Sequence, residues 1–313
     1  PTARFNVFTD YEAARAGLKN YSLPVVVKAS GLALGKGVYI CQTLEEAEQA
    51  LREMMVDKIF KESGSEVVVE EFLVGREISI HALCDGKDFV LFPPSQDHKR
   101  ALENDEGKNT GGMGTIAPLP FVSEADMQQI AEQVVKPTLE AMEKRGTPFK
   151  GLLYPGLIMT AEGPKVLEYN ARFGDPETQV YMRLMNSDVD LLALLESSAD
   201  GHLGSSIYGT IFRTDIFAAN VVLASGGYPG EYKKGVPITG IEEAEKDPRI
   251  TVFHAGTTYD GPTRSIITNG GRVLGVSAVG ATLQEALDTA YTAADKIQFE
   301  GKQLRRDIGA KSL

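Results

Sequence analysis

The sequence predicts an α+β protein with a small α+β lid, a larger α+β domain built on an antiparallel sheet, and a third region rich in strands. Short apolar strands are joined by hairpin turns such as Asp85-Gly86. Amphipathic helices that begin with capping boxes, at 43–55 and 282–297, lie between groups of strands. Glycine- and serine-rich sequence at 200–214 reads as a linker. We expect the lid in 1–73, the core in 74–205 and the C-terminal domain in 206–313.

Composition and charge argue against several classes of function. The formal net charge of -11 argues against non-specific binding to nucleic acid or to anionic membranes, since both need basic surfaces. No apolar run reaches transmembrane length, and no signal peptide is recognisable. Cys41 and Cys84 lie far apart, which predicts buried thiols rather than a disulfide framework or a zinc site. We therefore expect a cytoplasmic protein without nucleic-acid or membrane partners.

The stretch 165–179 carries the strongest chemical signal. Alternation along the strand 165–170 sends Glu168 and Asn170 to the same face, and a carboxylate beside an amide oxygen suits a hard cation such as Mg²⁺. The loop that follows holds Arg172 and Asp175. The alternative is a solvated strand edge followed by a structural ion pair between Arg172 and Asp175. The whole stretch favours a metal site next to a substrate site.

A glycine-rich hairpin predicts phosphate binding near the N-terminus. Two strands, 25–28 and 38–41, flank a loop whose glycines let the backbone approach a ligand closely. The candidate ligand contacts are Lys28, Gly35, Lys36 and Gly37. The loop is not a Walker A motif, because Gly37 stands where Ser or Thr would contact Mg²⁺ and a strand follows instead of a helix. The alternative is a flexible hairpin tip.

The next strand, 66–73, predicts a site for adenosine. Main-chain groups of an extended segment can pair with the adenine edge, and one carboxylate can accept both ribose hydroxyls. The alternative is an acidic strand edge, but the lysine hairpin upstream favours nucleotide binding. The candidates are Glu70, Glu71, Phe72, Leu73 and Glu77.

A long polar segment at 93–120 predicts a substrate loop, because loops of this length inside compact domains are commonly functional. It includes Asp97, Lys99 and His98, and we interpret His98 as a surface or hydrogen-bonded residue rather than a base. A helix at 123–145 should divide or kink at Pro137. The C-terminal region shows no charged cluster of catalytic type and is expected to act as a scaffold.

These pieces together describe ATP held between a lid and a larger domain, with a cation near the transferring phosphoryl group. No Ser-His-Asp or Cys-His arrangement is visible in the sequence. A carboxylate substrate could attack the γ-phosphate and form an acyl phosphate that an amine then captures.

The sequence resembles the ATP-grasp superfamily and, within it, the glycinamide ribonucleotide synthetases, also called phosphoribosylamine-glycine ligases. The resemblance spans essentially the whole chain, and RFGDPE after LEYN is its most specific part. The matching motifs are PVVVKASGLALGKGV at 24–38, VVVEEFLVGREIS at 67–79, QDHKR at 96–100, NTGGMG at 109–114, ARFGDPETQ at 171–179, LASGGYPG at 223–230, FHAGT at 253–257 and RRDIG at 305–309.

The resemblance implies an ATP-grasp fold and the joining of glycine to 5-phosphoribosylamine, with ATP converted to ADP and phosphate. It places Lys28 and Lys36 on the ATP phosphates, Glu71 and Leu73 on adenine, and Glu77 on ribose. It also assigns Mg²⁺ or Mn²⁺ to Glu168 and Asn170. Glycine would be handled by Arg172 and Asp175 with Asp97 and Lys99, and the substrate-binding backbone would be that of Gly111, Gly112, Met113 and Gly114.

The family also carries an N-terminal Rossmann-like domain and a further ATP-contacting lysine, which this sequence does not contain; that domain is a possible partner. Two alternatives stay open. One is a different ATP-grasp carboxylate-amine ligase, which would not need RFGDPE. The other is an ATP-binding module without catalysis.

Overall fold

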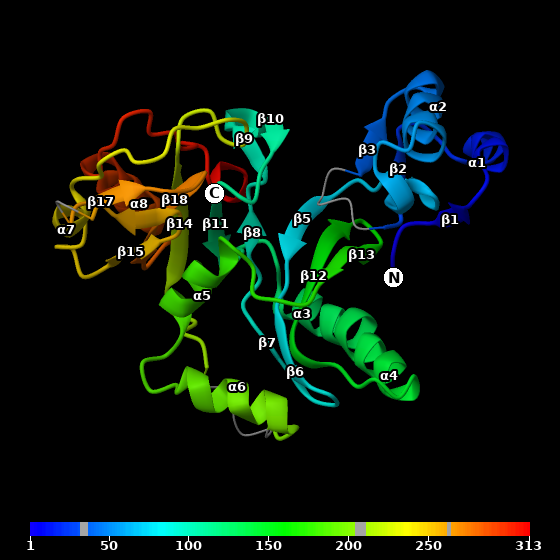
Figure 1. Ribbon diagram of the computed structural model, residues 1–313. Coiled ribbons are helices and arrows are strands. Elements are labelled where there is room, and N and C mark those ends of the chain that lie inside the picture. The colour runs from blue at the N-terminus through cyan, green and yellow to red at the C-terminus, as the bar shows by residue number, and fades with distance from the viewer. Residues whose placement is uncertain (32–36, 204–210, 262–263) are drawn as a thin grey trace. The chain divides into compact units, whose positions relative to one another are not determined.

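The computed structural model describes residues 1–31, 37–203, 211–261 and 264–313 (Figure 1). The chain forms two compact units. Unit 1 contains Pro1–Arg76 and Ile158–Leu167, and unit 2 contains Glu77–Leu157 and Glu168–Leu313. The predicted boundaries at residues 73 and 205 stay predictions.

Unit 1 is built on a four-stranded antiparallel sheet in the order β1-β4-β2-β3. The strands are β1 (Phe5–Phe8), β2 (Val25–Ala29), β3 (Val38–Cys41) and β4 (Val67–Glu71). Helices α1 (Tyr11–Gly17) and α2 (Leu44–Leu51) pack their buried alanine and leucine side chains against one face of this sheet. A π-helical turn, Arg52–Val56, follows α2, and short 3₁₀ turns cover Leu18–Asn20 and Lys61–Gly64.

Side chains cap the first turns of both helices in unit 1. Asp10 accepts a hydrogen bond from the Ala13 N–H at the start of α1. Thr43 accepts one from the Glu46 N–H, while the Glu46 carboxylate accepts from the Gln42 N–H. These caps satisfy backbone donors that have no partner inside the helix. The predicted helix at 43–55 is therefore confirmed, with its last turn in π-helical form.

A second antiparallel sheet has the order β13-β12-β6-β7, with β5 pairing β12. Its strands are β5 (Arg76–Ser79), β6 (Ala82–Asp85), β7 (Phe89–Leu91), β12 (Lys150–Thr160) and β13 (Gly163–Asn170). The predicted helix at 123–145 is divided into α3 (Glu124–Ile130), a π-helical turn (Ala131–Val135) and α4 (Lys136–Lys144). The division falls just before Pro137, as expected of a residue that cannot donate to the helical ladder.

The polar segment at 93–120 is not a single loop, so the expectation of a continuous loop was wrong, while its role in substrate binding stays a prediction. It contains four short strands: β8 (Gln96–Asp97), β9 (Arg100–Leu102), β10 (Glu106–Asn109) and β11 (Gly114–Ala117). A 3₁₀ turn, Glu103–Asp105, joins β9 to β10. Strands this short show little periodicity of their own, and β11 finds its partner more than a hundred residues away, where Gly114 pairs with Val221.

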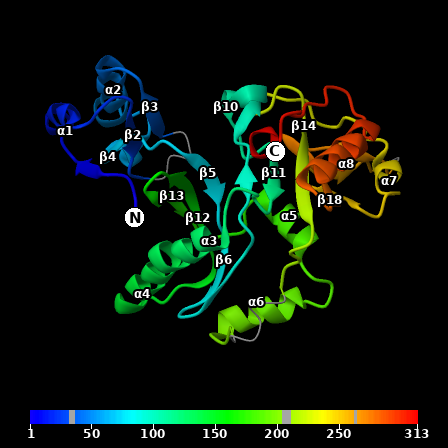
Figure 2. The same ribbon diagram turned by 180° about the vertical axis from the view of Figure 1, so that it is seen from behind.

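The third sheet has the order β15-β18-β14-β11-β8. Its remaining strands are β14 (Phe217–Ala224), β15 (Ile250–His254) and β18 (Arg272–Gly280). Helix α8 (Leu283–Lys296) packs on the face that carries Val221 and Val276. Helix α5 (Glu177–Leu184) packs on the opposite face, which carries Ala117 and Ala218, and Figure 2 shows it alongside β14. Strands from both sides of residue 205 thus share one sheet.

Smaller elements complete unit 2. They are α6 (Leu191–Asp200), α7 (Ile241–Ala244), the hairpin of β16 (Thr257–Tyr259) with β17 (Ile266–Thr268), and a final 3₁₀ turn, Ala310–Ser312. Among the helices of the described residues, none has the length and apolar character needed to cross a bilayer.

Candidate active site

One face of the sheet in unit 1 is not covered by its helices. Residues directly opposite each other in antiparallel strands place their side chains on the same face. The helix-covered face holds the buried Val25, Val27, Val67 and Val69. Strand register therefore puts two rows on the other face: Phe5, Glu70, Val26 and Ile40 in one, and Val7, Val68, Lys28 and Val38 in the next. This open sheet face is apolar except for one lysine and one glutamate.

Lys28 and Glu70 form an ion pair at the centre of the open sheet face. The Lys28 Nζ lies 2.6 Å from a Glu70 carboxylate oxygen, and both side chains are largely buried. The Glu71 carboxylate accepts a hydrogen bond from the Arg4 N–H, and the Glu71 N–H donates to the Arg4 carbonyl. An adenine contact through Glu71 would therefore use its carbonyl oxygen.

The other residues predicted to contact the nucleotide belong to different parts of the chain. Gly35 and Lys36 lie outside the described residues, whereas the Gly37 carbonyl accepts from the Ala29 N–H at 2.8 Å. Phe72 and Leu73 follow β4 in unit 1. Glu77 belongs to unit 2, where its carboxylate lies 4.0 Å from the Lys99 Nζ.

Glu168 and Asn170 lie side by side at the end of β13, as alternation along the strand predicts. The Asn170 Nδ2 donates to the Glu168 Oε1 at 3.3 Å. Among the described residues, no group of three or more His, Cys, Asp or Glu side chains forms a metal cage. Mg²⁺ needs no such cage, because it binds through one or two protein oxygens and completes its shell with water and phosphate. The two oxygen-bearing side chains therefore fit a hard divalent cation.

The two charges of the loop after β13 do not pair with each other, so the alternative of an Arg172–Asp175 ion pair is wrong. Arg172 donates to the Phe173 carbonyl at 2.9 Å and to the Asn170 Oδ1 at 3.3 Å. The Asp175 carboxylate instead accepts from Arg272 at 2.9 Å and from the Gln179 side chain at 3.1 Å.

Arg272, at the start of β18, is a site residue that sequence reasoning missed. Its guanidinium also donates to the Asp175 carbonyl at 2.6 Å and to the Gly111 carbonyl at 2.8 Å. It thereby joins the loop after β13, which carries Asp175, to the segment that contains Gly111. The expectation that the C-terminal region acts as a scaffold stays a prediction, and Arg272 adds a direct contact with Asp175.

Asp97 lies on β8 with a carboxylate oxygen, Oδ1, buried and without a hydrogen-bond partner in the described structure. Gly112 has a φ of +115°, and a Cβ there would collide with this oxygen and with the Pro176 ring. Burial, then the nearby Glu177 carboxylate, raises the pKa of Asp97 well above its usual range. Burial alone would lower the pKa of Lys99, but Glu77 and other nearby carboxylates raise it. Met113 is fully buried and Gly114 lies in β11.

Glu177, the first residue of α5, is also a member of this region that the sequence did not single out. Its side chain is 2% exposed and accepts hydrogen bonds from Tyr154 and from Ser79, the latter at 3.1 Å. Burial, followed by the Glu177 charge, raises the pKa of Tyr154. No local motif links residues 79, 154 and 177, so only the folded chain brings them together.

Two histidines are buried and hold glycine backbones. The His81 Nε2 accepts from the Gly174 N–H at 3.0 Å, and its Nδ1 lies 2.9 Å from the Tyr181 hydroxyl. The His98 Nε2 accepts from the Gly309 N–H at 3.0 Å, and its Nδ1 lies 3.1 Å from the Gly114 carbonyl. An imidazole that accepts at one nitrogen and donates at the other must be neutral. His98 is thus a hydrogen-bonded residue, as expected.

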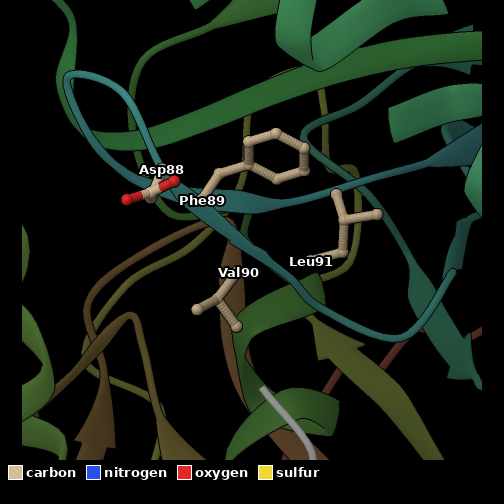
Figure 3. Close-up of a pocket in the computed structure, with 4 residues that line it drawn as sticks. All are labelled: Asp88, Phe89, Val90 and Leu91. Carbon is tan, nitrogen blue, oxygen red and sulfur yellow. The ribbon is translucent and has the colours of Figure 1, made fainter. Parts of the chain in front are cut away.

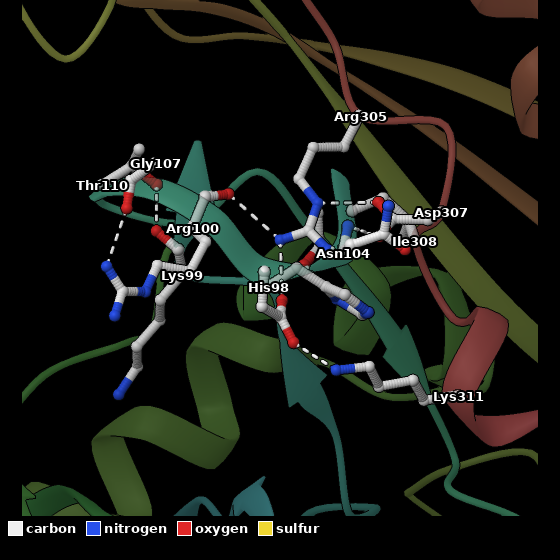
Figure 4. Close-up of polar contacts among 12 residues, drawn as sticks. His98, Lys99, Arg100, Asn104, Gly107, Thr110, Arg305, Asp307, Ile308 and Lys311 are labelled. Carbon is white, nitrogen blue, oxygen red and sulfur yellow. Dashed lines mark hydrogen bonds and ion pairs between the residues drawn. The ribbon is translucent and has the colours of Figure 1, made fainter. Parts of the chain in front are cut away.

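The C-terminal segment, through Arg305, forms hydrogen bonds with the hairpin of β9 and β10 that follows Lys99 (Figure 4). The Arg305 side chain is 1% exposed, and it donates to the Arg100 carbonyl at 3.1 Å and to the carboxylates of Asp105 and Asp307. Burial lowers the pKa of an arginine, but these two carboxylates raise it. This arrangement gives the RRDIG motif a positioning role.

In the described part of unit 2, two pockets are lined by residues other than the predicted site residues. The larger, about 340 Å³, lies along Asp88–Leu91 (Figure 3). The smaller, about 150 Å³, is lined by Ser225, Gly226, Lys233, Val236, Thr268, Glu300 and Gly301.

Comparisons with known proteins point in one direction. Residues 1–178 match the family model "Phosphoribosylglycinamide synthetase, ATP-grasp (A) domain", and residues 218–311 match the C domain of the same synthetase. A phosphoribosylamine--glycine ligase of Caldanaerobacter subterraneus is 46% identical over 99% of this chain and 72% of its own length. A trifunctional purine biosynthetic protein of Gallus gallus is 46% identical over 100% of this chain and 31% of its own length.

Solved structures agree with these matches. The crystal structure of phosphoribosylamine--glycine ligase from Thermotoga maritima has a TM-score of 0.86 and 38% identity, covering 98% of this chain and 74% of that one. A biotin carboxylase domain from Hydrogenobacter thermophilus has a TM-score of 0.71 at 16% identity, covering 97% of this chain and 64% of that one. The second likeness shows the fold alone.

Proposed function

This chain belongs to the phosphoribosylglycinamide synthetase family of ATP-grasp ligases in purine biosynthesis, and we propose that the residues described above carry out that family's reaction. The activity is the ATP-dependent joining of glycine to 5-phosphoribosylamine. The residue assignment rests on the order of four side chains at and after the end of β13. Glu168 and Asn170 lie side by side there, with the Asn170 Nδ2 donating to the Glu168 Oε1, and Arg172 and Asp175 follow within five residues.

The reaction has two steps in this proposal. A glycine carboxylate oxygen bonds to the γ-phosphorus of ATP, the bond from that phosphorus to ADP breaks, and glycyl phosphate forms. The amine nitrogen of phosphoribosylamine then bonds to the carbonyl carbon, phosphate leaves with the C–O bonding electrons, and the nitrogen loses a proton. The protein needs to orient the three substrates and neutralise charge.

The open sheet face of unit 1 is the proposed nucleotide surface. Its valine and isoleucine side chains suit the apolar faces of a purine ring, and the Lys28 ammonium suits phosphate oxygens. The Glu70 carboxylate, 2.6 Å from that ammonium, restricts where the Lys28 side chain can point. The further nucleotide contacts we propose are Gly35, Lys36, Gly37, Glu71, Phe72, Leu73 and Glu77.

Glu168 and Asn170 are the proposed ligands of a divalent cation, Mg²⁺ or Mn²⁺. When bound, such an ion would neutralise phosphate charge as the phosphoryl group moves. Arg172, which donates to the Asn170 Oδ1, restrains the amide at this position. The same guanidinium is a planar fork and therefore suits the glycine carboxylate.

The amine side of the reaction is assigned to two carboxylates. Asp175 is the proposed partner of the glycine ammonium, and Arg272 together with Gln179 fixes its orientation. Asp97 has a raised pKa, which suits a group that accepts a proton from the attacking amine. Lys99 and the Gly111 to Gly114 backbone are proposed to contact the phosphorylated substrates.

The test is phosphate release by the purified protein with each substrate omitted in turn. We expect turnover only when ATP, glycine and phosphoribosylamine are all present. Activity with another amino acid in place of glycine would instead indicate a different carboxylate-amine ligase. ATP binding by calorimetry without turnover would indicate a binding module.

The nucleotide surface needs its own test. We expect Lys28→Met to weaken ATP binding, measured by calorimetry, because it removes the ammonium on the open sheet face. Lys19→Met, on an exposed 3₁₀ turn of the same unit, is the matched control. Equal ATP affinity in both variants would refute the assignment of Lys28.

A further inference from the structure

A row of polar side chains crosses the third sheet beneath helix α5. Strand register places Asp97 opposite Thr115, Thr115 opposite Asn220, Asn220 opposite Ser277, and Ser277 opposite Thr251. Because directly opposed residues share a face, all of these side chains lie on one face. Asn220 alternates with Val221, which packs against α8, so the polar row faces α5.

Helix α5 presents a polar stripe of its own to this row. Gln179 and Arg183 are four positions apart and therefore lie on the same side of the helix. The Arg183 guanidinium donates to the Thr251 hydroxyl at 2.7 Å, at the far end of the row. At the near end, the Gln179 Nε2 donates to the Asp175 carboxylate at 3.1 Å. Since a carboxylate only accepts, this contact identifies the Gln179 oxygen as the atom that points elsewhere.

The buried polar side-chain atoms that have no hydrogen-bond partner in the described part of the chain all lie along this row and stripe. They are Asp97 Oδ1, Thr115 Oγ1, Gln179 Oε1, Arg183 Nε, and both Asn220 Oδ1 and Asn220 Nδ2. We call these five residues the α5 seam. Thr115 and Asn220 are each 0% exposed, so bulk solvent does not reach them. The seam holds acceptors, donors and a hydroxyl that can act as either.

Buried polar groups in native proteins almost always have a partner, and where the protein supplies none, ordered water does. A single buried atom without a partner can be a strained exception, but unpartnered atoms on five residues of one row and its facing helix favour a shared partner. The sheet side of the seam carries short side chains, and Gly275 beside Asn220 carries none. The Asn220 amide occupies the space next to Gly275, where a Cβ would lie 2.8 Å from the Asn220 Oδ1.

We propose that bound water molecules occupy the α5 seam and link Asp97 to Arg183 through Thr115, Asn220 and Gln179. Water can donate to the oxygens of Asp97 and Gln179 and accept from the Arg183 Nε. Thr115 can also donate or accept, but the structure shows no hydrogen bond between its hydroxyl and another protein atom. The ligand of this site is therefore water itself, held between a helix and a sheet.

The bound water positions two carboxylates. It restrains Asp97 directly, and it restrains Gln179, whose amide holds Asp175. Thr115 and Asn220 are thus positioning residues that do not touch substrate. This consequence rests on the proposed roles of Asp97 and Asp175, whereas the hydration of the seam does not.

A crystal structure of the protein at a resolution that shows ordered solvent tests the hydration. We expect water within hydrogen-bond distance of the Thr115 Oγ1 and the Asn220 amide, and its loss or displacement in Thr115→Val. A seam without water, in which the side chains pair directly with one another, would overturn the proposal.

Thermal unfolding gives a second test, since Thr115→Val keeps the shape of the side chain but removes its hydroxyl. In a hydrated seam the variant removes the hydroxyl that the bound water contacts, so Tm should fall. In a dry seam whose atoms have no partner it removes an unpaired group, and Tm should rise or stay unchanged, whereas direct pairing between side chains is recognised in the crystal structure. A Tm that rises or stays unchanged would also overturn the proposal.

Kinetics test the positioning role, with Ser277→Ala as the matched control. Ser277 lies in the same row, but its hydroxyl already donates to the Ala219 carbonyl at 3.1 Å. We expect Thr115→Val to raise the KM for glycine several-fold with the KM for ATP unchanged, and Ser277→Ala to change neither. An equal rise of the KM for glycine in both variants would count against a positioning role for Thr115. If the parent protein shows no glycine-dependent turnover, the proposed function fails, while the crystal structure and Tm still decide whether the seam is hydrated.

Discussion

Arg272 donates to the Asp175 carboxylate over 2.9 Å, although the two residues lie 97 positions apart in the sequence. The same guanidinium donates to the carbonyl of Asp175 and to that of Gly111. One side chain of β18 thus holds both the loop before α5 and the segment before β11. The proposed glycine site depends on a strand that contributes no substrate contact of its own.

Arg272→Ala should lower kcat/KM for glycine. A hydrogen bond to a charged group contributes about 1.5–3 kcal/mol, which corresponds to a fall of roughly ten- to a hundredfold. Steady-state phosphate release at varied glycine measures the effect. Arg249→Ala is the control, since Arg249 pairs with Asp247 and Glu285 instead of with the site. Unchanged glycine kinetics in Arg272→Ala would contradict the role of this contact.

Glu168→Ala should abolish metal-dependent turnover, because it removes the charged member of the proposed ligand pair. Glu168→Gln keeps an oxygen ligand without the charge, so we expect partial recovery at high Mn²⁺ or Mg²⁺. Titration of each metal against phosphate release in both variants measures this.

Glu162→Ala, on the turn between β12 and β13, is the control for Glu168→Ala. Its carboxylate pairs with Lys165 at 2.9 Å and is largely exposed. The metal assignment would be refuted if Glu168→Ala and Glu162→Ala retained the same activity.

Arg172→Lys should weaken the use of glycine more than the use of ATP. A lysine ammonium is a point charge and cannot make two parallel hydrogen bonds to a carboxylate. It also loses the restraint on the Asn170 amide, which lies 3.3 Å from the Arg172 guanidinium. Separate KM values for glycine and for ATP distinguish the two effects. If the KM for glycine is normal and a higher metal concentration is needed, Arg172 would be assigned to the metal site instead of the substrate site.

Local patterns predicted the parts of the site that a single strand or turn determines. Alternation along β13 was sufficient to pair Glu168 with Asn170, because residues two positions apart in a strand point to the same face. Capping boxes located the starts of α2 and α8, since each involves residues only three positions apart. These features need no knowledge of the rest of the fold.

The contacts that the sequence could not predict all join distant segments. Asp175 has an arginine three positions before it, and nothing local shows that its partner is Arg272 instead. Glu177 meets Tyr154 and Ser79 because α5 and the second sheet pack together. The segment 93–120 resembled a loop because its strands have no clear local pattern. Strands β8 and β11 are stabilised by pairing with each other and, for β11, with β14. Register between strands is a tertiary property.

Acid should unfold this protein partly through His81 and His98. Burial, and then the Arg172 charge, lowers the pKa of His81 from 6.5 to about 3. Burial, and then Arg305, lowers the pKa of His98 to about 4. Below pH 6.5 the unfolded chain therefore binds protons that the native state does not, so the free energy of unfolding falls as pH falls. Each histidine contributes about 1.4 kcal/mol per pH unit between its two pKa values.

His98→Gln isolates one of these contributions. The glutamine oxygen can still accept from the Gly309 N–H, but the side chain cannot be protonated. Denaturant unfolding between pH 6.5 and 4.5 should give the variant a pH slope lower than that of the parent by about 1.4 kcal/mol per pH unit. His202→Gln, at an exposed site, controls for the substitution itself. If the slopes of the parent and of His98→Gln coincide, His98 takes up a proton in the native state, where its Nε2 can no longer accept from the Gly309 N–H.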